Sequence, residues 1–151
     1  MSWLLDTDVL SQPAKRSGDP RVIAWLRREK DRCYTSAVVI AQLAYWVRSK
    51  DGRQRVALQA WLTQLIDVME GRIHGFNVGV AHVWAGQEVL FEKAGQQMPV
   101  EDSYIAATAR KCGLTIVTGN DKDFRRPGLK ATSLTDDDIR FGENWLWPNR
   151  D

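Results

Sequence analysis

Two short apolar segments, each followed at once by acidic residues, constrain the fold most. Leu4–Leu5 leads into Asp6 and Asp8, and the β-branched segment 114–118 leads into Asn120, Asp121 and Asp123. We expect both segments to be strands, with weaker strands at 73–76 and 129–134. Apolar residues at helical spacing predict helices at 21–30, 37–50, 53–70, 78–94 and 102–111. Strands that alternate with helices predict an α/β fold, with a parallel sheet between helices on both faces.

Several helix starts carry residues typical of an N-cap, the residue whose side chain accepts a hydrogen bond from the first turn. Asp19 is followed by Pro20, which suits the first helical position. Ser36 is a second N-cap candidate, and we expect Asp102 to cap the helix that it begins.

The composition is that of an ordinary soluble protein. Hydrophobic residues make up 44% and charged residues 26% of 151 residues, so we expect a single domain over residues 1–151. We find no apolar run long enough for a membrane span and no signal-peptide pattern. Cys33 and Cys112 fit neither a zinc motif nor a disulfide framework. These features favour a reducing, cytoplasmic setting without membrane contact.

Acidic side chains from distant positions are predicted to meet beyond the carboxyl ends of the strands, where ligands bind in such sheets. Asp6 and Asp8 project into one space if the extended backbone continues that far, because residues two apart share a side of a strand. Asp102, Asp121 and Asp123 would join them. Converging carboxylates repel one another. A hard cation such as Mg²⁺ removes this conflict and bridges to substrate phosphate.

Each acid also has a purely local interpretation. Asp102 alone would be a helix cap, and Asp121 and Asp123 alone would be turn residues that bond to their own backbone. Asp6 and Asp8 alone would cap the next turn. The residues by themselves leave a metal site and these local roles about equally open.

Four motifs and three shorter matches along the chain resemble the patterns of a known protein family. They are LLDTDVLS, SAVVIAQL, PVEDSYIAATA and LTIVTGNDKDF, with shorter matches at 21–26, 60–62 and 71–73. In this order and spacing they resemble PIN-domain proteins of the VapC toxin type, including plasmid-stability toxins. The corresponding family patterns are LLDTN-V-[LI]-S, S-A-x-x-x-x-E-L, P-x-x-D-x-x-I-A-A-T-A and L-x-[LI]-V-T-R-N-x-x-D-F. The resemblance covers almost the whole chain.

The resemblance implies a three-layer α/β fold and an endoribonuclease (hydrolase) activity that depends on Mg²⁺ or Mn²⁺. It implies metal binding by Asp6, Asp102 and Asp123. The positions implied in catalysis are Asp6, Gln42, Asp102, Asn120 and Asp123, with Asp8, Thr118 and Asp121 as supporting candidates.

The resemblance also implies partners. They are a VapB-like antitoxin, a second copy of the toxin in a homodimer, and structured RNA such as tRNA or rRNA as the substrate. Operator DNA would be contacted only through the antitoxin.

This sequence departs from the family at the second acid, where Gln42 stands in place of Glu. Glutamine still accepts a hydrogen bond from a metal-bound water, but it provides neither a negative charge nor a proton acceptor. Three explanations stay open: a natural loss of activity, an engineered change, or compensation by Asp8 or Glu101. Asp8, Asn77 and Gly119 are further departures, at positions where the family has Asn, Asp and Arg.

Two other function classes compete with the nuclease. One is a catalytically impaired PIN module that pairs with an antitoxin or another subunit, with Trp46, Trp145 and Trp147 as interface anchors. The other is an aspartyl-phosphate receiver or phosphatase, which the helix-rich segment 78–111 fits poorly.

The first third of the chain is basic, although the net charge is only +2. Its helix carries Arg27, Arg28, Lys30 and Arg32. These side chains either position a phosphate backbone or form a solvated helix surface, and the second interpretation is the commoner one.

Overall fold

The computed structural model describes residues 1–134. The strands are β1 (Trp3–Leu5), β2 (Cys33–Ser36), β3 (Ile73–His74), β4 (Thr115–Val117) and β5 (Ala131–Thr132). The α-helices are α1 (Thr7–Leu10), α2 (Pro20–Glu29), α3 (Ala37–Arg48), α4 (Gly52–Val68), α5 (Val78–Lys93) and α6 (Val100–Cys112). Short 3-10 helices span Gln12–Ala14, Lys30–Arg32 and Asp121–Phe124.

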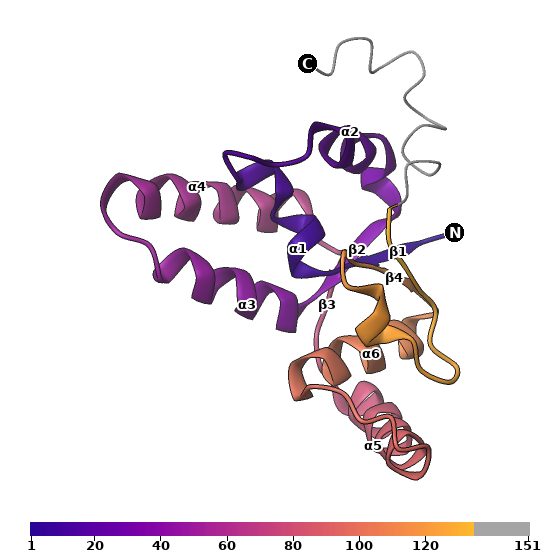
Figure 1. Ribbon diagram of the computed structural model, residues 1–151. Helices are drawn as coiled ribbons and strands as arrows, with labels where there is room; N and C mark the ends of the chain where they lie inside the picture. Colours follow the sequence, from indigo (N-terminus) through magenta and orange to yellow (C-terminus); the bar gives the residue numbers. More distant parts are fainter. Residues whose placement is uncertain (135–151) are drawn as a thin grey trace.

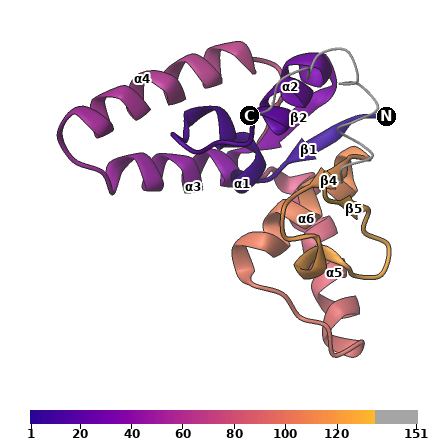
Figure 2. The ribbon, with the colours of Figure 1, turned by 45° about the horizontal axis from the view of Figure 1, so that its top comes forward.

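The five strands form one sheet in the order β3-β2-β1-β4-β5, and every strand pair is parallel. The chain moves outward from β1 to β3 and then returns to the other side of β1. Because parallel crossovers are right-handed, this reversal places α2, α3 and α4 on one face and α5 and α6 on the other, as Figures 1 and 2 show. The predicted parallel α/β sheet between helical layers is confirmed.

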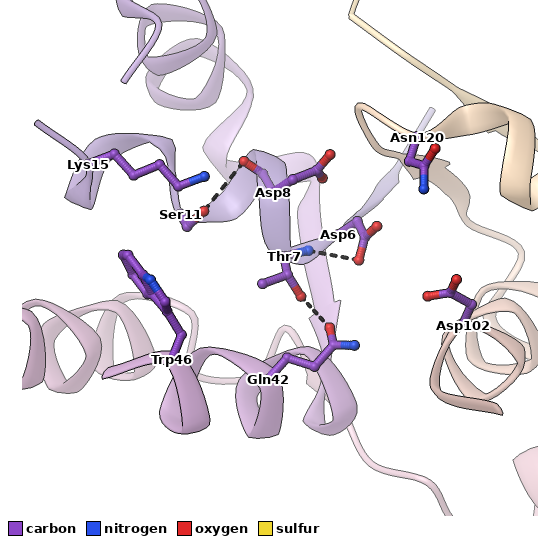
Figure 3. Close-up of a pocket in the computed structure, with 9 residues that line it drawn as sticks. All are labelled: Asp6, Thr7, Asp8, Ser11, Lys15, Gln42, Trp46, Asp102 and Asn120. Carbon is purple, nitrogen blue, oxygen red and sulfur yellow. Dashed lines mark hydrogen bonds between the residues drawn. The ribbon is translucent and has the colours of Figure 1, made fainter. Parts of the chain in front are cut away.

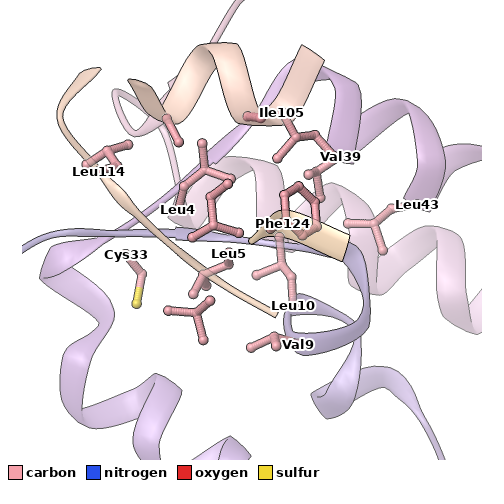
Figure 4. Packing of buried hydrophobic residues seen from close by; sticks show 14 of the residues in the cluster. Leu4, Leu5, Val9, Leu10, Cys33, Val39, Leu43, Ile105, Leu114 and Phe124 are labelled. Carbon is pink, nitrogen blue, oxygen red and sulfur yellow. The ribbon is translucent and has the colours of Figure 1, made fainter. Parts of the chain in front are cut away.

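The core explains why such short strands are stable. β1 is only three residues long, yet Leu4 and Leu5 are buried because helices cover both faces of the sheet. Figure 4 shows Val39 and Leu43 of α3 and Ile105 of α6 among the side chains of this cluster. Most stabilisation therefore comes from packing of helices against the sheet rather than from the strand ladders.

Two N-cap predictions are confirmed by hydrogen bonds. The Asp19 carboxylate accepts from the Arg21 backbone N–H at 2.9 Å, and the Ser36 hydroxyl oxygen accepts from the Val39 N–H at 3.2 Å. The Ser36 cap matters for the site, because it starts α3 directly at the end of β2 without an intervening loop.

Other predictions were wrong in detail. Strand β2 was missed, because Cys-Tyr-Thr-Ser is short and shows no clear alternation. Strand β1 ends at Leu5. Asp6 is still extended but caps α1, so Asp8 lies within that helix rather than on a continued strand. The prediction that Asp102 caps its helix also fails: α6 begins at Val100, and Asp102 lies in its first turn.

In the part of the chain that the structure describes, no helix is both long and apolar enough for a membrane crossing. The proposed interface residues Trp145 and Trp147 lie outside the described residues.

Candidate functional site

The candidate site lies where β1 and β4 end, side by side. From β1 the chain continues to β2 on one side, and from β4 it continues to β5 on the other. Such a switch point leaves a crevice at the carboxyl ends of the strands. A pocket of about 470 Å³ opens there, lined by Asp6, Thr7, Asp8, Ser11, Lys15, Gln42, Trp46, Asp102 and Asn120. Figure 3 shows how these side chains surround it.

Asp6 is fixed from both sides of the switch point. Its Oδ1 accepts from the Thr7 backbone N–H at 2.8 Å, and its Oδ2 accepts from the Thr118 hydroxyl at 2.9 Å. Burial raises the pKa of Asp6, the charge of Asp8 raises it further, and the bonds from Thr7 and Thr118 oppose the rise. Thr118, predicted as a supporting residue, thus orients the Asp6 carboxylate.

Asp8 connects α1 to the loop after β4. Its Oδ2 accepts from the Gly119 backbone N–H at 2.7 Å. A Cβ atom at position 119 would lie 2.5 Å from that same oxygen, so a larger residue there would displace the Asp8 carboxylate. The other oxygen, Oδ1, is buried and has no hydrogen-bond partner within residues 1–134. An unpaired buried carboxylate oxygen is costly unless a cation or water meets it.

Gln42 approaches the pocket from α3. Its Oε1 accepts from the Thr7 hydroxyl, and its Nε2 donates to Glu101 Oε2 at 2.9 Å. The side chain therefore bridges the first helix of the fold and the first turn of α6.

Asp102 faces the pocket from the first turn of α6 (Figure 3). Burial raises its pKa to about 6, and the charges of Asp6, Asp123, Glu101 and Asp8 contribute in that order. The turn is held on α5 through Ser103. Asp102 therefore ionises reluctantly, because it is partly buried and because other carboxylates lie within electrostatic range.

Asn120 and Asp123 form a pair at the edge of the site. The Asn120 side-chain amide donates to Asp123 Oδ2, and the Asn120 backbone N–H donates to the Thr118 hydroxyl oxygen at 3.1 Å. Asp121 points elsewhere, in an ion pair with Arg125 at 2.8 Å. The structure therefore brings together all the predicted site residues except Asp121.

Comparisons with known proteins identify the family of this chain. The PIN-domain family profile matches residues 3–130. Toxin FitB of Neisseria gonorrhoeae is 33% identical over 124 residues, which cover 80% of this chain and 89% of FitB. The chain belongs to the PIN-domain family.

Two further relatives extend the comparison of this PIN domain. VapC ribonuclease Y4jK of Sinorhizobium fredii is 28% identical over 129 residues, covering 83% of this chain and 92% of that protein. A solved structure of FitAB bound to an IR36 DNA fragment superposes with a TM-score of 0.80 at 28% identity. The match covers 87% of this chain and 94% of the other.

The acids of this PIN domain form an open set of oxygen ligands rather than a closed cage. Within residues 1–134, no group of three or more His, Cys, Asp or Glu side chains is arranged to hold a metal ion. Mg²⁺ retains several waters and needs only one or two carboxylates. Asp6 and Asp102 line the same pocket and are the acids that could hold such an ion, and the unpaired Oδ1 of Asp8, which lines the pocket too, is a further acceptor.

The sequence prediction missed Lys15 and the pocket-lining position of Trp46. Lys15 follows the LLDTDVLS motif closely, which is the one signal that would have pointed to it. The basic residues predicted on this helix do not line the acidic pocket. Arg27 of α2 and Lys30 of the 3-10 helix that follows line a different cavity, Arg28 is near Glu29, and all three are exposed. The interpretation of that segment as a solvated helix surface is therefore favoured.

Proposed function

We propose that this PIN domain is a divalent-metal-dependent endoribonuclease that acts as the toxin of a toxin–antitoxin pair. One observation carries the proposal: Asp6, Asp8 and Asp102 line one pocket at the switch point, where burial, and after it the charges of the neighbouring acids, raise the pKa of Asp102 to about 6. Such mutual repulsion destabilises the protein unless a cation relieves it. The similarity to FitB and to VapC ribonuclease Y4jK supports the choice of chemistry.

Asp6 and Asp102 are the residues that would hold Mg²⁺ or Mn²⁺, with Asp123 at the edge of the same set. The ion would lower the pKa of a water molecule and neutralise charge on the phosphodiester. Thr7 and Thr118 keep the Asp6 carboxylate in one orientation, while Asn120 holds Asp123. These bonds fix the site's geometry before substrate binds, which lowers the cost of reaching the transition state.

Lys15 supplies the positive charge that a phosphate substrate requires. Among the residues of the described chain that line the pocket, it is the single Lys or Arg. Its ammonium group would neutralise an RNA phosphate next to the acids. Trp46 lies on the same side of the pocket (Figure 3) and offers an aromatic face to a neighbouring base.

The partner proposals rest on the solved relatives. FitAB was solved on DNA, so we propose an antitoxin partner that carries the operator contacts. A toxin homodimer, a cytoplasmic location and a structured RNA substrate such as tRNA or rRNA belong to the same proposal.

Gln42 favours one competing function, a PIN module that binds its antitoxin without cutting RNA. Its amide gives no negative charge to the site. The two functions differ in what a cation does to the purified protein, because a ligand that binds the folded state raises its melting temperature.

The deciding experiment combines Mn²⁺ binding with cleavage of a mixed tRNA and rRNA preparation. We expect Mn²⁺ to raise the melting temperature and to support cleavage, and we expect Asp6→Asn to abolish both. Asp121→Asn is the matched control, because Asp121 is ion-paired with Arg125 outside the pocket. Wild-type protein that neither binds Mn²⁺ nor cuts RNA would exclude the nuclease.

A further inference from the structure

The hydrogen bonds of Gln42 suggest which residue provides the negative charge that glutamine lacks at the second-acid position. Its Nε2 donates to Glu101 Oε2 at 2.9 Å, and its Oε1 accepts from the Thr7 hydroxyl. An ionised glutamate only accepts hydrogen bonds, so the amide nitrogen must face Glu101. The chemistry of its two partners therefore fixes the orientation of the Gln42 amide.

A glutamate at position 42 would not fit this arrangement. Two carboxylates would then face each other across the gap that the Gln42–Glu101 hydrogen bond now spans, with no proton to share near neutral pH. Glutamine at position 42 and glutamate at position 101 are therefore complementary. The pair carries one negative charge, located on α6 instead of α3.

Glu101 also stands beside the candidate metal site. It directly precedes Asp102, and its charge is one of those that raise the pKa of Asp102. Gln42 lines both the acidic pocket and a neighbouring cavity of about 690 Å³, and Glu101 lines that second cavity. Glu101 thus acts on the acids from the far side of Gln42.

We propose that Glu101 supplies the second-acid charge of this site, and that Gln42 holds the Glu101 carboxylate in place. The proposal rests on the metal-dependent function described above. Glu101 is a positioning residue in this view: its exposed carboxylate acts through its charge and through the Gln42 bridge, not as an enclosed ligand.

The test is a charge swap measured by calorimetric titration with Mn²⁺ alone, without RNA, at pH 7.5 and low salt. The proteins are wild type, Glu101→Gln, Gln42→Glu and the double variant Gln42→Glu/Glu101→Gln. We expect Glu101→Gln to weaken Mn²⁺ binding roughly three- to tenfold, through the loss of one nearby charge. The double variant should return close to wild-type affinity, because it restores the charge on α3.

Glu92→Gln is the matched control. Glu92 is also exposed and lies on α5, and its charge is not among those that act on Asp102. It should leave Mn²⁺ affinity unchanged. Urea unfolding of the same proteins gives a second readout: Gln42→Glu alone should lose stability at pH 7.5, and adding Glu101→Gln should recover it.

The outcomes separate the two proposals. If Glu101→Gln binds Mn²⁺ as tightly as Glu92→Gln while Asp6→Asn does not bind, the metal site stands and the role of Glu101 is refuted. If the double variant binds Mn²⁺ as weakly as Glu101→Gln, a carboxylate at position 42 does not replace the one at position 101. The proposed exchange of charge between the two positions is then refuted. Wild-type protein that binds no Mn²⁺ would overturn both proposals.

Discussion

Asp102 combines burial with four neighbouring acids, so its charged form is strained in the folded protein. Its pKa of about 6 lies above the ordinary value of 3.8. The folded protein therefore holds a proton that the unfolded chain releases as the pH rises from about 4 to 6. Stability falls over that range and levels off above it, because the folded state binds more protons than the unfolded state. A functional site built this way reduces the stability of the fold that carries it.

Replacing Asp102 by Asn should therefore stabilise the metal-free protein at pH 7.5. The advantage should shrink as the pH falls from 6 towards 4 and disappear below the unfolded pKa of 3.8, where the wild-type carboxyl becomes protonated in both states. Urea unfolding at a series of pH values measures this difference. Asp121→Asn should leave the free energy of unfolding within about 0.5 kcal/mol, as expected for an exposed ion pair. An equal effect of Asp102→Asn at pH 4 and 7.5 would contradict the assignment.

Asp8 and Gly119 should behave as one unit. Gly119→Ala places a methyl group against Asp8 Oδ2 and disturbs the hydrogen bond to the Gly119 N–H, so we expect a loss of about 1 kcal/mol in stability. In an Asp8→Ala background the same change should cost almost nothing, because both the contact and the bond are already gone. Thermal or urea unfolding of the four proteins gives the coupling energy. Additive effects would show that the contact is not formed.

At the scale of the elements, the sequence predicted helix caps, which depend on neighbouring residues, but not the exact ends of strands and helices. Asp19 and Ser36 were predicted as caps because an Asp or Ser just before a helix commonly accepts a hydrogen bond from a backbone N–H of the first turn. Whether the extended backbone reaches Asp8 was left open by the sequence, because tertiary pairing of the Asp6 N–H with the Val117 carbonyl decides where extension stops. Asp102 was misread as a cap because Val100 and Glu101 already belong to α6.

The same limits applied to the site. The acids Asp6 and Asp102 were predictable from motif and position. Compensation by Glu101 was one of the alternatives that the sequence left open. Lys15 was not predicted, because Gln42 and Asp102, which line the pocket with it, lie more than 20 residues away in sequence. Strand β2 was missed for a similar reason: it is held by parallel pairing with β1 and β3, and pairing leaves little trace in four residues.

The start of α5 offers a test at this scale. Asn77 occupies a position where the family has Asp, and its Oδ1 accepts from the Val80 N–H at 3.0 Å. Asp and Asn are comparable N-caps, so Asn77→Asp should leave stability nearly unchanged. Asn77→Ala should lower the free energy of unfolding by about 1 kcal/mol, because the cap is lost. Equal stabilities of the Ala and Asp variants in urea would show that the cap contributes nothing.

At the scale of the whole molecule, the order of the strands decides where chemistry can occur. After β3 the chain crosses back over the sheet and forms β4 on the other side of β1. Asp6 and the loop at 118–120 therefore meet, although they lie far apart in sequence. The helical layers then bring Gln42 from one face and Asp102 from the other. No single element contains the site, and it therefore forms only when the sheet is complete.

Metal binding should reverse the pH dependence of the whole fold. A cation competes with the proton on Asp102, so its binding weakens as the pH falls through about 6. At a Mn²⁺ concentration near 100 times its Kd, the stabilisation is about 2.7 kcal/mol, or roughly 5–10 °C in melting temperature for a protein of this size. Thermal melts should therefore show a small Mn²⁺ shift at pH 5 that grows to a plateau above pH 7. In Asp102→Asn this growth should be lost, and a wild-type shift that does not change with pH would mean that the ion binds away from Asp102.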